Sequence, residues 1–342
     1  MKNIVKLMLA LWATLAISFA AFADDGKKGT YTEVKTPPST AQMVKVGFYP
    51  ISVYQLDMSS NTYYVDMYVW FRWKGDINPI ETLEFTNMVE EWGKQQEALL
   101  ETPKVLADGS KYQIVRVEGR FVQPFSLINF PLDRQKLSIM VEDTTNGVET
   151  VSYEIDRESS GIGKSLDIPG WILDGWTAKT YAHNYGSQFG EEGTPTVYSA
   201  LAFNLEISRP ISFFFWALLF PLFIVLIAAL AALNIKPNEL DVRTGLPAGA
   251  LLTAIFLQKS YADDLPELGY LILMDQIYLV AYALIVFTLV RSIYAYKVVS
   301  AINDENDARF KSVQKADRGM FIAQILLFAA AVAAIISFGA DS

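Results

Sequence analysis

Hydrophobic and polar positions change their pattern near residue 209. Before it, short runs rich in β-branched and aromatic residues recur, and several alternate apolar and polar positions with a period of two. Such alternation indicates strands with one buried face. Seven runs predict strands: 44–49, 63–73, 112–122, 136–142, 148–155, 171–181 and 197–208. Turn signals separate them, which favours an immunoglobulin-like β-sandwich of about ten strands.

Long apolar segments follow the predicted sandwich. Four of them are expected to be membrane-spanning helices: 210–235, 244–264, 268–296 and 315–340. The first carries no charged residue and is long enough to cross a bilayer. The pattern therefore predicts an extracellular or periplasmic ligand-binding sandwich over residues 24–208 and an all-α transmembrane domain over residues 209–342.

The first 23 residues predict a secretory signal peptide. Two lysines precede a short apolar stretch, and Ala21-Phe22-Ala23 forms a small-residue cleavage site. An uncleaved anchor helix is the alternative. With the sandwich outside, the inner connections 236–243 and 297–318 both carry Lys and Arg, as the positive-inside rule requires.

The composition of the chain excludes several kinds of catalytic and binding site. The chain has 342 residues, of which 52% are hydrophobic and 19% charged, a mixture too apolar for one soluble domain. It has no cysteine, which removes thiolate catalysis and zinc–thiolate sites. A net charge of −9 without a basic run excludes nucleic acid as a partner. No cofactor is expected.

The second apolar segment differs from an ordinary span because small and charged residues share one of its faces. On a helix these residues recur at spacings of four and three: Gly245, Gly249, Leu252, Phe256, Lys259 and Asp263. A face of this kind usually meets water, which predicts a pore lining. Helix–helix packing is the alternative, because small residues also suit close packing.

A motif in the sandwich gives this pattern a context. Phe130-Pro131-Leu132-Asp133-Arg134-Gln135 resembles the FPxDxQ core of the pentameric ligand-gated ion channels, the Cys-loop receptor superfamily. The cysteines that flank this core in animal members are absent, as in the prokaryotic members. Further matches lie at these places: Leu83–Asn87, Arg209-Pro210, Leu265-Pro266 and Asp275-Gln276.

The resemblance implies a homopentameric, ligand-gated channel in the inner membrane of a bacterium. Its acidic selectivity position aligns with Asp241, and Glu239 is a second candidate. Five carboxylates about 5 Å from a cation would together attract it by roughly 4 kcal/mol before screening. This implies permeant monovalent cations, although Lys259 on the pore face would oppose them.

The resemblance also implies residues that couple the sandwich to the helices. Asp133 and Arg209 match a recurrent acid–base contact, and Asp57 and Pro266 are further candidates. An exposed salt bridge of little energetic value is the alternative interpretation.

A ligand site is implied between neighbouring subunits. Its candidate residues are Phe85, Glu142, Asp143, Tyr185, Tyr198 and Tyr63. Aromatic rings around carboxylates suit an ammonium ligand, but ordinary surface or core tyrosines fit the pattern equally well. His183, the single histidine, is a candidate pH sensor. Acidic loops make Ca²⁺ a candidate modulator, with no metal ligands assigned.

Two other functions remain open at this point. A pore-less sensory receptor would share the same architecture. A membrane-anchored hydrolase would need paired carboxylates, for which Glu142-Asp143 is a weak signal. We expect a channel and not an enzyme, because neither alternative explains the polar second span.

Overall fold

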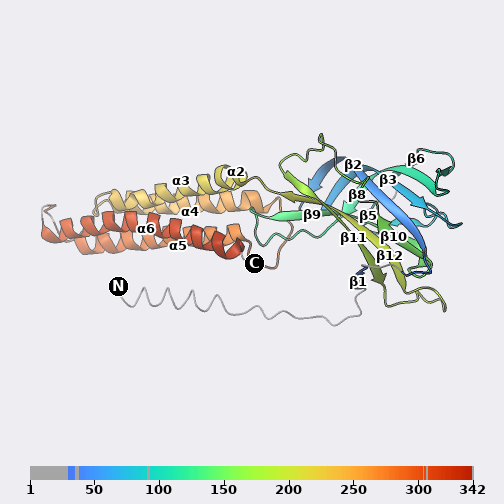
Figure 1. The fold of residues 1–342 in the computed structure, drawn as a ribbon. Helices are drawn as coiled ribbons and strands as arrows, with labels where there is room; N and C mark the ends of the chain where they lie inside the picture. The colour runs from blue at the N-terminus through green and yellow to red at the C-terminus, as the bar shows by residue number, and fades with distance from the viewer. Residues whose placement is uncertain (1–29, 35–37, 91–92, 303, 306, 341–342) are drawn as a thin grey trace.

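The structure is a computed structural model that describes residues 30–34, 38–90, 93–302, 304–305 and 307–340. The predicted signal peptide, residues 1–23, lies outside the described residues. A β domain is followed by a bundle of four long helices that runs away from it (Figure 1). The predicted fold class, a mainly β sandwich followed by four apolar helices, is confirmed.

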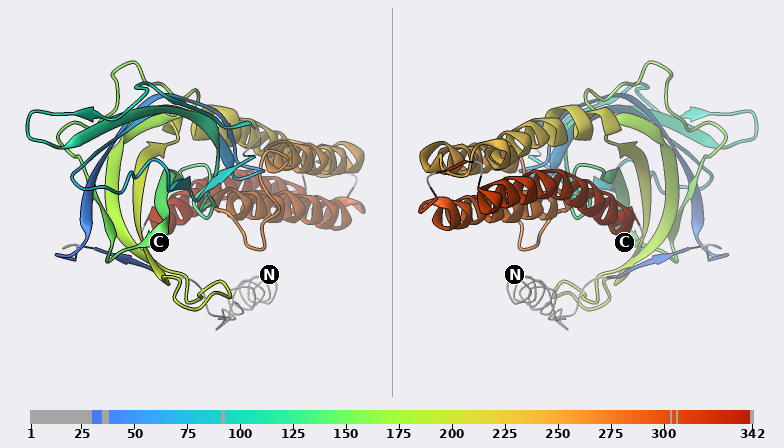
Figure 2. Two further views of the ribbon diagram at one scale, coloured as in Figure 1. Left: turned by 90° about the vertical axis from the view of Figure 1, so that its right-hand side faces the viewer. Right: turned by 90° about the vertical axis from the view of Figure 1, so that its left-hand side faces the viewer.

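Two sheets form the sandwich. One has five strands in the order β1 (Thr30–Glu33), β11 (Ile172–Asn184), β12 (Val197–Ser208), β9 (Arg134–Gly147) and β4 (Leu83–Phe85). The other contains β10 (Val151–Ile155), β2 (Gln42–Asp57), β3 (Thr62–Trp73), β8 (Lys111–Val122) and β5 (Met88–Val89), while β6 (Gln95–Ala98) and β7 (Lys104–Val105) also pair with β8. Neighbours are antiparallel except β10 and β2. Figure 2 shows both sheets curving around a common interior.

The period-two alternation of the sequence places one face of each long strand in the core. Along β2, Val44, Val46 and Phe48 are fully buried while Lys45 is exposed. Phe48 stacks across the sandwich on Phe203 of β12, with ring centroids 5.1 Å apart. Apolar burial of this kind is the main stabilising term of such a domain.

The described residues contain twelve strands, where the sequence predicted about ten. The five strands without a predicted run, β1 and β4 to β7, have two to four residues each. A strand that short does not display a period of two, so its pairing partner and not its own sequence defines it.

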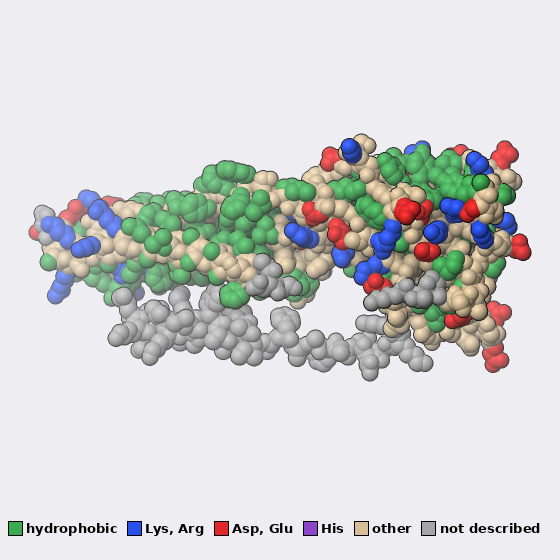
Figure 3. All heavy atoms as spheres, in the orientation of Figure 1, with side chains coloured by type: hydrophobic (Ala, Val, Ile, Leu, Met, Phe, Trp, Pro, Cys, Tyr) green, Lys and Arg blue, Asp and Glu red, His purple; other side chains and the backbone are tan. Residues whose placement is uncertain are grey.

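Among the described residues, four helical segments are long and apolar enough to span a membrane. The first, Ile211–Asn234, joins α2 (Ile211–Phe213), a π-helical turn η2 (Phe214–Leu219), α3 (Phe220–Leu230) and a 3₁₀ turn η3 (Ala231–Asn234). The others are α4 (Leu240–Ala262), α5 (Leu273–Val299) and α6 (Ala308–Ala340). In Figure 3 hydrophobic side chains dominate the visible face of the bundle, and charges gather at its far end and over the sandwich.

The bundle joins the sandwich through backbone contacts as well as through the chain. The start of α5 donates two hydrogen bonds to the loop before β9: Leu273 N–H to Ile128 C=O at 2.8 Å, and Met274 N–H to Phe130 C=O at 3.2 Å. The ring of Phe130 also lies 5.9 Å from that of Tyr261 on α4. The loop that carries the FPLDRQ motif therefore rests on two of the four helices.

Candidate functional site

One side of α4 packs on its own chain and the other is uncovered. Pro247, Ala250 and Ala254 are buried within the bundle. All six predicted pore-lining residues lie on the uncovered side: Gly245, Gly249, Leu252, Phe256, Lys259 and Asp263. Leu252 and Phe256 are 55% and 65% exposed, although both are large and apolar. An uncovered apolar side of this kind needs lipid, another subunit or a narrow pore beside it.

The two predicted pore glycines leave open space. A Cβ atom built on Gly245 or Gly249 would have no neighbour within 4 Å in this chain. Neither glycine is therefore required for packing inside the protomer.

Charges lie at both ends of the same side. Asp241 is exposed in the first turn of α4, directly after Glu239 and Leu240. At the other end, Lys259 Nζ lies 2.6 Å from Asp263 Oδ1, and both side chains are mostly exposed. Lys259 is thus paired with a carboxylate one turn away, which offsets its repulsion of cations in part.

Sequence reasoning missed a buried ionic cluster at the Asp241 end of the bundle. Arg243 of α4 is completely buried, and its Nη2 donates to Asp317 Oδ2 of α6 at 2.6 Å. Arg291 Nε of α5 donates to the other oxygen of Asp317 at 2.7 Å. One carboxylate therefore joins three helices. Charged residues inside apolar spans were the available signal, because such residues are rarely tolerated without a partner.

Asp133 and Arg209 form a direct pair at the junction of the two domains. Arg209 Nε donates to Asp133 Oδ1 at 2.8 Å, and Asp133 is buried. Gln135 of the same motif donates to the other carboxylate oxygen at 2.6 Å. The motif therefore supplies both the buried charge and a hydrogen bond that orients it.

Aromatic rings surround the guanidinium of Arg209. Its Cζ lies 4.2 Å from the ring centroid of Trp171, 4.8 Å from that of Phe130 and 5.8 Å from that of Phe213. Cation–π contacts of this kind gain strength where water is excluded. Trp171 precedes β11 and Phe213 belongs to α2, so Arg209 joins three separate elements.

A cavity of about 360 Å³ lies beside this cluster. Asp57, the last residue of β2, lines it together with Arg209, and Asp263, Asp264 and Leu265 line it from just beyond the end of α4. Among the described residues the carboxylate of Asp57 accepts hydrogen bonds from Ser59 and Ser60, not from Arg209. These bonds lower the pKa of Asp57. Pro266 directly follows Leu265 of the cavity wall.

The predicted ligand residues fall into two groups. Glu142, Tyr185 and Tyr198 lie together near the end of β9 and the hairpin of β11 and β12: the Tyr185 and Tyr198 rings are 5.8 Å apart, and burial together with the nearby Glu142 carboxylate raises the pKa of Tyr185. His183 Nδ1 lies 2.7 Å from Glu142 Oε2. Asp143, next to Glu142, is fully buried.

Asp143 is a structural residue in this arrangement. Its oxygens accept bonds from Thr82 Oγ1 at 2.7 Å and from the backbone N–H of Thr145 at 2.9 Å. Phe85 is also buried, edge-on to Phe121. Tyr63 is the residue that the structure does not bring to this surface: it is fully buried, and its hydroxyl donates to Ser138 C=O. The side chain of Tyr63 belongs to the inward face of β3 and does not reach the surface where Tyr185 and Tyr198 lie.

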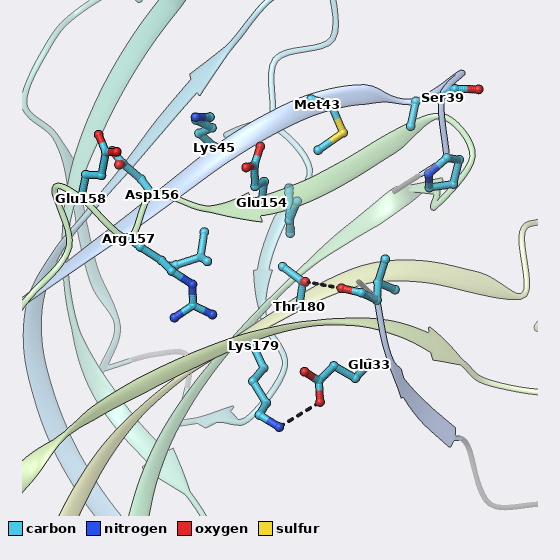
Figure 4. A pocket seen from close by; sticks show the side chains of 15 residues that line it. Glu33, Ser39, Met43, Lys45, Glu154, Asp156, Arg157, Glu158, Lys179 and Thr180 are labelled. Carbon is cyan, nitrogen blue, oxygen red and sulfur yellow. Dashed lines mark hydrogen bonds and ion pairs between the residues drawn. The ribbon is translucent and has the colours of Figure 1, made fainter. Parts of the chain in front are cut away.

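A larger cavity, about 800 Å³, lies elsewhere on the sandwich, between β1, β2, β10 and β11. Charged side chains of both signs line it, and the ion pair between Lys179 and Glu33, 2.8 Å long, stands at its edge (Figure 4). None of the predicted site residues lines it. The described residues contain no group of three or more His, Asp or Glu side chains that could hold a metal ion.

Comparison with known proteins adds one relative. The chain is 22% identical, over 328 residues, to a proton-gated ion channel of Gloeobacter violaceus, and the match covers 90% of this chain and 87% of that protein. No protein-family model matches the chain. The similarity extends over the sandwich and the membrane helices together. It agrees with the resemblance of the FPLDRQ motif to pentameric ligand-gated channels, and the relative is an ion channel and not an enzyme.

Proposed function

We propose that the chain forms a homopentameric cation channel in a bacterial inner membrane, opened by a ligand or by a change of pH sensed by the outer sandwich. The observation that carries the proposal is the uncovered side of α4. Among the four spans this helix is the least apolar, and its uncovered side combines glycines, large apolar side chains and charges. Similarity to a proton-gated channel over nine-tenths of the chain supports the same function.

In this proposal α4 lines the pore. Five copies of Leu252 and Phe256 form apolar rings that block ions by dewetting when the helices approach. Gly245 and Gly249 keep the inner half wide, and Asp263 with Lys259 stands at the outer mouth. Conduction then depends on how far the five helices separate.

Selectivity follows from carboxylates at the inner mouth. Asp241 is exposed on the same side as the apolar rings, and Glu239 lies just before the helix. Five copies of Asp241 concentrate cations by their summed field. The Lys259–Asp263 pair is neutral overall, and the exposed Asp264 and Glu267 beyond it add further carboxylates at the outer end of the helix.

Coupling is assigned to the cluster around Arg209. Asp133, held by Gln135, fixes the guanidinium, and rings from three elements enclose it. Breaking a partly buried pair of this kind is costly, so the cluster favours discrete arrangements over gradual ones. Asp57 and Pro266 lie at or next to the adjoining cavity and act as further contacts between the domains.

Reconstitution into planar bilayers tests the function. Unitary currents that appear as pH and small amines are varied are the expected result. Bilayers containing folded protein but without currents under any of these conditions would favour a pore-less receptor.

A further inference from the structure

The single histidine of the chain is held between two tyrosine rings. His183 stacks on Tyr31, with ring centroids 3.9 Å apart and planes 14° from parallel. On its other side the ring of Tyr185 lies at 3.9 Å, tilted by 42°. The faces of aromatic rings attract cations. The imidazole therefore occupies the kind of place in which an organic cation would bind.

A buried carboxylate completes this environment. Glu142 Oε2 lies 2.7 Å from His183 Nδ1, and both residues are buried. With a neutral imidazole and an ionised carboxylate, the pair holds one uncompensated negative charge away from water, which is unfavourable. One added proton converts the pair into a neutral hydrogen-bonded ion pair and places a cation between the two rings.

A separate strand supplies Tyr31. In β1, Tyr31 is paired in register with His183 of β11, and Glu33 forms an ion pair with Lys179 on the same neighbour. Val34 N–H also donates to Thr180 C=O at 3.0 Å. The strand thus adds an edge to the five-stranded sheet and places its tyrosine over the imidazole.

Resting on the proposed channel function, we propose that the ligand of the outer site is the proton. The His183–Glu142 pair binds it, and Tyr31 and Tyr185 stabilise the resulting imidazolium. Tyr31 is a residue of the ligand site that only this N-terminal strand provides.

Other ionisable groups lie around the histidine. From β9, Asp143 is held by hydrogen bonds to Thr82 and backbone N–H groups, and Glu84 of β4 faces Glu142. Burial raises the pKa of Tyr31, as it does for the nearby Tyr185 and Tyr198, so these hydroxyls stay neutral. Burial also raises the pKa of Glu142, which favours the proton-bound pair.

The strands that hold this pair also lead to the coupling cluster. Glu142 pairs with Ala200 between β9 and β12, and the same ladder ends at Arg134 and Ser208. Arg134 directly follows Asp133 in the chain, and Ser208 directly precedes Arg209. A change at the His183–Glu142 pair therefore acts on two hydrogen-bonded strands whose far ends carry the coupling residues.

Histidine-selective NMR of the labelled, detergent-solubilised protein tests proton uptake, because one histidine gives one signal. The signal should titrate between about pH 5 and pH 8. Tyr31→Leu keeps the imidazole covered but removes the ring, and should lower the midpoint by about half a pH unit. Tyr31→Phe keeps an aromatic ring and should have a midpoint close to that of wild type. Glu142→Gln should lower it by about one unit or more, because the anionic partner is lost.

Tyr49→Leu is the matched control for Tyr31→Leu, because Tyr49 is 40% exposed against 44% for Tyr31 and lies on the other sheet. It should leave the midpoint unchanged. A histidine signal that does not titrate in this range, or a midpoint that Tyr31→Leu does not move, would overturn the proposal.

Currents from reconstituted channels give the second readout. The pH of half-maximal current should shift in Tyr31→Leu in the same direction as the NMR midpoint, and His183→Gln should remove this component of the response. Wild-type currents with a pH dependence identical to that of His183→Gln would reject the proton site but leave the channel intact. Absence of wild-type current at every pH would instead reject the proposed function.

Discussion

Arg243 on α4 and Asp317 on α6 form a fully buried ion pair, 2.6 Å long, between the helix assigned to the pore and the last helix of the chain. Arg291 shares the same carboxylate. Two positive charges therefore depend on one buried negative charge. The N-terminal end of α4 is therefore tied to α6, although these helices are far apart in sequence.

Asp317→Asn should destabilise the folded protein strongly. The substitution leaves two buried guanidinium groups without a counter-charge, and loss of one partner from a buried pair costs roughly 3–5 kcal/mol. Thermal unfolding in detergent would measure the effect. Asp307→Asn, in the loop just before α6, is the control and should change stability little. A wild-type melting temperature for Asp317→Asn would contradict the role assigned to the cluster.

Leu252→Ser and Phe256→Ala should each raise the resting conductance. Both reduce the apolar barrier in the proposed pore, where narrow hydrophobic rings exclude ions by dewetting. Leu326→Ala is a matched control, because Leu326 on α6 is 65% exposed, as Phe256 is. Unchanged closed-state current in both pore variants would mean that another face of α4 lines the conduit.

Asp241→Lys should weaken or invert the preference for cations. Five added lysines replace an attraction of roughly 4 kcal/mol, before screening, by a repulsion of similar size. Reversal potentials in a salt gradient measure the preference. Glu101→Lys in the sandwich makes the same charge change far from α4 and should leave the reversal potential in place. If Asp241→Lys also leaves the reversal potential unchanged, residues other than Asp241 determine the selectivity.

Asp133→Asn and Arg209→Gln should each impair opening, and their effects should not add. Residues in one hydrogen-bonded network give interaction energies of roughly 0.5–3 kcal/mol in a double-mutant cycle. The equilibrium between closed and open channels, taken from current at saturating stimulus, supplies the four corners of the cycle. The exposed pair Arg72–Asp108, at 2.6 Å, provides a control cycle with little coupling expected. Additive effects at Asp133 and Arg209 would argue against a shared role in gating.

Stability should depend on pH through Glu142. Burial raises its pKa in the folded state. A group of this kind contributes stability that is fully present below its unfolded pKa, about 4.3, and is lost as pH rises through the folded value. Wild type should therefore lose stability relative to Glu142→Gln as pH increases from about 4. Thermal unfolding across that range measures the difference. Glu154→Gln removes an exposed carboxylate and should show no such trend.

The periodicity of apolar residues in the sequence was enough to predict the long strands and the membrane-spanning helices. The strands β2, β3, β8, β9, β11 and β12 and the four spans each overlap a predicted run or segment. The ends of the helices were predicted less accurately. Helix α4 begins at Leu240 and not at residue 244, and α6 begins at Ala308 and not at residue 315. In both helices the first turns contain charged residues, which an apolar pattern does not detect.

The sequence predicted less of the candidate sites, because these depend on contacts between residues that are far apart in the chain. The acid–base contact of Asp133 with Arg209 was expected from a motif, and the two side chains lie within hydrogen-bond distance, although their role in gating stays a proposal. Arg243 and Asp317 carry no motif and meet only through the tertiary packing of α4 and α6. Tyr31 is similar, since its strand is defined by pairing with β11 and not by its own sequence.

The empty space around Gly245 and Gly249 has an evolutionary consequence. Because an added methyl group at either position meets no atom of its own chain, and alanine favours a helix over glycine by up to about 1 kcal/mol, larger residues there do not compromise the protomer. On the proposed assembly, each such substitution is repeated five times around the axis. The diameter and lining of the inner conduit can therefore diverge between related channels by single mutations, without an accompanying demand for compensating changes in the protein's interior.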